Sequence, residues 1–193
     1  MNVQEYLIQM KNIQSKILEF VENEDFNKDS ISSFIISQLN SDNIFEIKEI
    51  LHLISKIENN HHRSQLFFDK IQFIIILLKE KIQKCLSNFE IFKIFKTNKK
   101  ILLFLFEEKI IVPDKKICNF IRNNLSELQN FFSYFFPEFK MFFNTLDLLV
   151  LQEIKEMTEN NLELFEKNRK IGENDFYICS LIRNDSITEF ITY

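Results

Sequence analysis

The amino-acid sequence predicts an all-α fold of stacked helix hairpins, and three observations carry this prediction. Apolar residues recur at spacings of three and four along the chain, whereas alternating apolar and polar residues are rare. Only two prolines, Pro113 and Pro137, interrupt its 193 residues. The sequence holds one glycine and no alanine, so its core is built from large side chains, among them 23 phenylalanines. Helices folded back on one another fit all three observations.

Residues 1–86 are expected to form a leader of longer helices. The first helix runs from Val3 to Glu22, because apolar residues recur there along a single stripe. Asp29 or Ser30 is expected to cap the second helix, since both side chains accept hydrogen bonds from backbone amides.

A third helix follows the polar residues 41–43, and a fourth is predicted over residues 65–85. The fourth carries the run from Phe73 to Leu78, which is apolar on all sides. A helix of this kind belongs at the centre of a core.

Residues 87–193 are predicted to form degenerate ankyrin-like helix hairpins that share a continuous core with the leader. Ser87 and Glu90 have the spacing of a capping box, which marks the start of a short helix. Asn98 is expected to cap the helix that follows. Helix hairpins of this size rely on their neighbours to cover their apolar faces, as in solenoid proteins.

Asp114 is expected to open a further short helix, and Pro137 suits the first turn of a long helix running from Glu138 to about Asn160. The last segment ends at Tyr193 with an apolar face that nothing in the sequence matches. The final unit is therefore expected to be incomplete, and its open end is a candidate surface for self-association.

Composition excludes several functional classes. Phosphate-binding loops, dinucleotide-binding turns and the nucleophile elbow each need at least two glycines at fixed spacing, and this chain has Gly172 alone. The balance of 24 basic and 28 acidic residues argues against nucleic-acid binding. The longest apolar runs have six residues, far short of the roughly 20 that cross a bilayer, so no membrane span is expected.

The three cysteines, Cys85, Cys118 and Cys179, lie far apart and form no metal-binding or disulfide pattern. Buried reduced thiols are the expectation. The N-terminal residues lack the charge and apolar pattern of a signal peptide, so the predicted location is cytoplasmic.

Four stretches of the chain resemble one protein family: residues 59–71, 87–111, 134–140 and 169–193. They are similar to the N-terminal domain of unknown function of the large ankyrin-repeat family of trichomonad protists. The resemblance implies an all-α, ankyrin-like solenoid with longer N-terminal helices, acting as the helical leader of a protein-binding array. No ankyrin signature lies in the sequence up to Tyr193; if the protein ends there, the groove that the family would use is expected to be missing.

The sequence and the resemblance together predict a non-enzymatic protein–protein interaction module with an unknown protein partner. No cofactor or metal is expected. The candidate interaction surface comprises His61, His62, Arg63, Lys99 and Lys100. The ordinary interpretation of the histidine loop is helix capping, and that of the lysine turn is a solvated turn. The alternative function is a metal-binding or hydrolytic protein that uses His61 and His62, although zinc would need further ligands.

Overall fold

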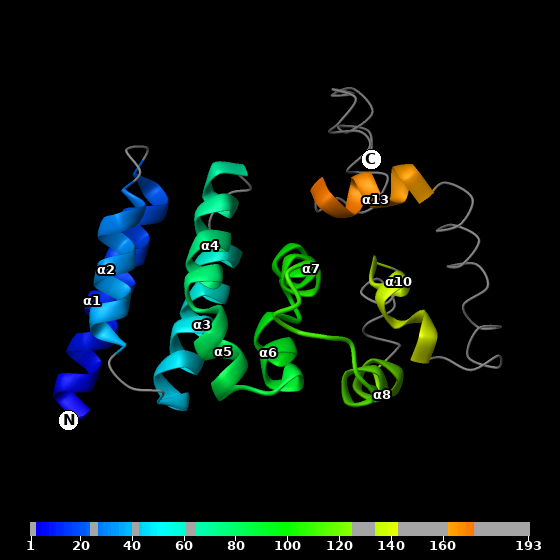
Figure 1. The fold of residues 1–193 in the computed structure, drawn as a ribbon, viewed down its shortest axis with the longest axis horizontal. Helices are drawn as coiled ribbons and strands as arrows, with labels where there is room; N and C mark the ends of the chain where they lie inside the picture. The colour runs from blue at the N-terminus through cyan, green and yellow to red at the C-terminus, as the bar shows by residue number, and fades with distance from the viewer. Residues whose placement is uncertain are drawn as a thin grey trace, which may run out of the picture. The chain divides into compact units, whose positions relative to one another are not determined.

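A computed structural model of the chain describes residues 3–23, 27–39, 43–60, 65–124, 134–142 and 162–171. The described residues form an all-α fold (Figure 1). The chain divides into two compact units, Met1–Val112 and Pro113–Tyr193, here called unit one and unit two. The boundary expected from the sequence, between residues 86 and 87, falls inside unit one.

Unit one begins with an antiparallel pair, α1 (Val3–Glu22) and α2 (Lys28–Gln38). The predicted bounds of α1 are confirmed. The side chain of Gln9 donates a hydrogen bond to the carbonyl of Gln38 at 2.9 Å, which places the end of α2 beside the first half of α1. The predicted cap of α2 is wrong, because Asn27 precedes Asp29 and Ser30 and its side chain accepts from the Ser30 amide.

The next helices are α3 (Ile44–Asn60), α4 (Gln65–Leu77) and α5 (Lys79–Cys85). The prediction of one helix over residues 65–85 is wrong, because the chain turns at Leu78. The amide of Leu78 lies within hydrogen-bonding distance of two successive carbonyls, a tightening typical of a helix end. After the turn α5 packs against α3.

A helix hairpin completes unit one, formed by α6 (Asn88–Phe95) and α7 (Lys99–Glu107). The predicted capping box at Ser87 and Glu90 is present, with both reciprocal hydrogen bonds formed. All residues from Ile101 to Phe106 are buried, which makes α7 a central element of the core. α6 packs against α3, so α3 contacts both the helix pair before it and the hairpin after it.

Unit two is described through α8 (Lys115–Asn123), α10 (Phe136–Phe139), the 3₁₀ turn η1 (Lys140–Phe142) and α13 (Leu162–Ile171). Asp114 caps α8 as predicted, its carboxylate accepting from the Ile117 amide at 2.8 Å. Pro137 lies in the first turn of α10, as expected. The α-helix predicted to continue from Glu138 gives way to the 3₁₀ turn η1 after Phe139, and residues 143–160 lie outside the described part.

Candidate functional site

The lysine turn between α6 and α7 carries two of the residues that the sequence assigns to an interaction surface. Lys99 and Lys100 occupy the first turn of α7, and both are half-buried. Burial lowers the pKa of the Lys99 ammonium. The Lys100 ammonium lies 4.2 Å from the centre of the Phe68 ring, a cation–π contact. These two lysines are therefore only partly solvated.

Buried polar groups fix this turn to α3. Asn98 is buried, and its side-chain oxygen accepts from the Ser55 hydroxyl at 2.8 Å and from the Thr97 hydroxyl at 3.3 Å. The Ser55 hydroxyl also lies 3.2 Å from the carbonyl of Ile94. Asn98 is the N-cap residue of α7 as predicted, but its side chain bonds to its neighbours and makes no capping hydrogen bond to an α7 amide. The start of α7 is held by tertiary contacts instead.

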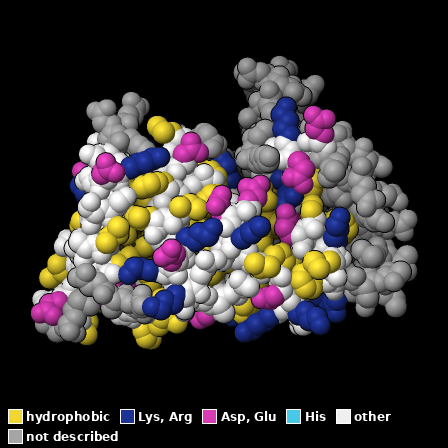
Figure 2. All heavy atoms as spheres, in the orientation of Figure 1, with side chains coloured by type: hydrophobic (Ala, Val, Ile, Leu, Met, Phe, Trp, Pro, Cys, Tyr) yellow, Lys and Arg dark blue, Asp and Glu magenta, His cyan; other side chains and the backbone are white. Residues whose placement is uncertain are grey.

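A second lysine–aromatic pair lies on the same hairpin. Lys93 of α6 places its ammonium 4.7 Å from the centre of the Phe89 ring. Lys96, at the end of α6, is exposed. Over unit one, Figure 2 shows basic and acidic side chains interspersed on the face drawn. Cationic groups and aromatic carbon thus lie together on the hairpin.

The histidine loop that the sequence singled out, His61, His62 and Arg63, lies outside the described residues. Its proposed roles in interaction or metal binding stay predictions. The remaining histidine, His52, is half-buried on α3. Across the segments that the structure describes, no three His, Cys, Asp or Glu side chains come together as a metal site would require.

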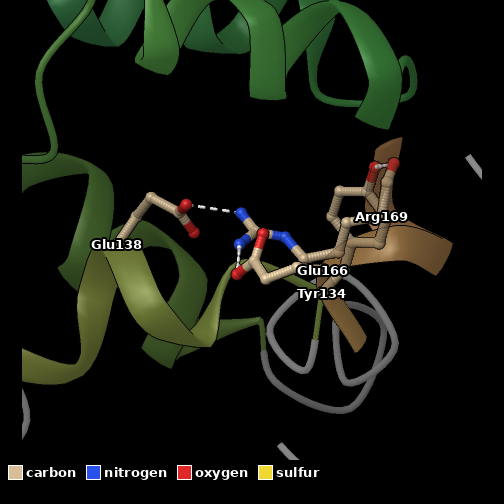
Figure 3. A network of polar contacts seen from close by, with 4 residues as sticks. All are labelled: Tyr134, Glu138, Glu166 and Arg169. Atoms are coloured by element: carbon tan, nitrogen blue, oxygen red, sulfur yellow. Dashed lines mark hydrogen bonds and ion pairs between the residues drawn. The ribbon is translucent and has the colours of Figure 1, made fainter. Parts of the chain in front are cut away.

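Unit two contains a buried ionic network around Arg169 of α13 (Figure 3). The Arg169 guanidinium donates to a carboxylate oxygen of Glu138 on α10 and to one of Glu166, the latter at 2.8 Å. The Tyr134 hydroxyl donates to the backbone carbonyl of Arg169. The same guanidinium lies 5.5 Å from the Tyr134 ring centre and 5.4 Å from that of Phe165. These contacts join α13 to α10 and to Tyr134, which lies just before α10.

The electrostatics of the network are dominated by desolvation. The Arg169 side chain is 3% exposed and that of Glu138 is 19% exposed. Burial raises the pKa of the Glu138 carboxyl, even though the nearby Arg169 charge and hydrogen bond act in the opposite direction. Within the described residues, Glu138 Oε2 and Arg169 Nε have no hydrogen-bond partner. The Arg169–Glu138 pair therefore holds α13 against α10, and the burial of the two charges costs free energy.

Sequence reasoning missed this network, although one signal was present. The chain has four arginines among its 24 basic residues, and Arg169 is one of them. Arginine suits buried ion pairs better than lysine does, because its planar guanidinium offers several donors and is weakly hydrated. Neither Glu138 nor Tyr134 stands out in the sequence, since both lie more than 30 positions from Arg169.

Of the two cysteines that the structure describes, only one is buried as the sequence predicts. Cys118 is buried and Cys85 is half-buried, and among the described residues neither forms a disulfide, whereas Cys179 lies outside the described residues. None of the helices described in the structure is long and apolar enough to span a membrane. Comparisons of the chain with protein-family models, with curated proteins and with solved structures found no match.

Proposed function

We propose that the chain is a non-enzymatic protein–protein interaction module, built as an ankyrin-like α-solenoid that serves as a helical leader. The observation that carries this proposal is the succession of antiparallel helix pairs in unit one. α1 packs on α2, α3 on α4, and α6 on α7, and contacts between pairs join α1 to α3 and α3 to α6 (Figure 1). Arrays of this kind present extended surfaces on which proteins bind.

The lysine turn is the surface that we assign to the partner. Lys96, Lys99 and Lys100 lie on a turn whose backbone is held by the buried contacts of Ser55 and Asn98. A surface that is already ordered loses little conformational entropy on binding, which favours affinity. Its cations and aromatic carbon suit a protein segment that carries acidic and apolar side chains.

We further propose a reducing, cytoplasmic location, with which the thiol state of Cys85 and Cys118 is consistent. The resemblance to the trichomonad ankyrin-repeat family rests on the sequence stretches quoted above and remains part of the proposal. The metal-binding or hydrolytic alternative depends on His61 and His62, and no described contact favours it.

Site-specific photo-crosslinking tests this function. A photoreactive residue at Lys96 should capture a discrete protein from an extract of the source cells, and the purified partner should then bind the chain in calorimetry. The charge reversals Lys99→Glu and Lys100→Glu should each weaken that binding at least about tenfold, or 1.4 kcal/mol. Lys115→Glu, which reverses an exposed lysine on α8, is the matched control and should leave affinity unchanged. Equal affinity for all variants would refute this surface assignment.

A further inference from the structure

We draw no further inference here: the strongest candidate, the surface patch of exposed apolar side chains that Val3 and Leu7 form at the start of α1, carries nothing because nothing in the structure shows what covers it.

Discussion

Replacing Arg169 with methionine is expected to destabilise unit two in a manner that depends on pH. Methionine keeps much of the aliphatic volume of arginine but removes the charge that compensates the Glu138 carboxylate. Removing one partner of a buried ion pair typically costs 3–5 kcal/mol, because the other charge is left buried and unpaired. Glu138 can avoid part of this cost, because its carboxyl group can take up a proton and lose its charge.

The free energy needed to protonate Glu138 sets an upper limit on the cost of removing Arg169, and this limit can be calculated. Protonating a carboxyl group with an ordinary pKa near 4.3 costs about 3.7 kcal/mol at pH 7 and about 1 kcal/mol at pH 5, at 1.36 kcal/mol per pH unit. Arg169→Met should therefore lower the free energy of unfolding by roughly 3 kcal/mol at pH 7 and by no more than about 1 kcal/mol at pH 5. The cost should grow steadily between these two values.

In the unchanged protein, the protonation of Glu138 also makes stability fall as the pH rises. Its pKa is raised on folding, so the stability that its protonation contributes is fully present below the unfolded pKa and is lost as pH rises through the folded pKa. Glu138→Gln removes this titration but keeps an oxygen that can accept from Arg169. We expect it to lower stability much less than Arg169→Met does and to flatten the pH dependence between pH 4 and 7.

Hydrogen-exchange mass spectrometry is the appropriate assay, because peptides covering residues 134–142 and 162–171 report on the network locally. Thermal unfolding followed by circular dichroism at pH 5 and pH 7 gives the global effect. Lys115→Met, which removes an exposed cation from α8 of the same unit, is the control and should show no comparable pH dependence. An Arg169→Met cost that is equal at both pH values, or a Glu138→Gln cost as large, would refute the reasoning.

Three further predictions concern unit one and can be checked by urea denaturation. Lys109→Gly should raise the free energy of unfolding by about 1 kcal/mol, because Lys109 has a φ of 54° that costs glycine little; no gain over Lys109→Ala would contradict this. Lys70→Met should lower it by roughly 1–3 kcal/mol, because two backbone carbonyls at the end of α1 lose a donor; an unchanged midpoint would show that water replaces the ammonium. Ser55→Ala should cost about 1 kcal/mol and speed amide exchange at the start of α7, whereas unchanged exchange there would show that Asn98 is held by other contacts.

The parts of the fold that the sequence predicted correctly depend on local signals. The capping box joins Ser87 to Glu90, and the carboxylate of Asp114 caps the helix that begins one residue later. In both cases the interacting groups lie within three residues of each other. The all-α class is equally local, since it follows from apolar spacing within each segment.

Apart from the cap of α2, where the neighbouring Asn27 takes the place of Asp29 or Ser30, the differences from the helix predictions involve contacts between segments distant in the sequence. The break at Leu78 involves no proline or glycine and separates α4 from α5, whose lysines reach carbonyls in other helices. Asn98 has the right residue type for a cap, but Ser55, 43 positions earlier, bonds its side-chain oxygen. The Arg169 network likewise depends on Glu138, 31 positions away. Residue type and spacing along the chain do not show which distant residues will come into contact.

Scarcity of glycine accounts for a recurring feature of the helix C-termini. The last carbonyls of a helix lack intrahelical donors, and a glycine in the left-handed conformation is the common solution. Here lysine ammonium groups from other helices donate to these carbonyls instead. Lys70 reaches the end of α1, Lys81 the Leu39 carbonyl after α2 at 2.8 Å, and Lys79 the Glu108 carbonyl after α7 at 2.7 Å.

Lys109 shows the same substitution within the backbone. It follows α7 in the left-handed conformation, its amide donates to Phe106, and the Ile110 amide donates to Leu105, which is the hydrogen-bond pattern of a glycine-terminated helix. A lysine there pays a steric penalty that glycine would avoid. The scarcity of glycine that excludes glycine-rich phosphate loops is thus matched by lysines at positions where glycine commonly ends a helix. Because Lys70, Lys79 and Lys81 each reach from one helix to the end of another, the C-terminal ends of α1, α2 and α7 become tertiary contacts within unit one.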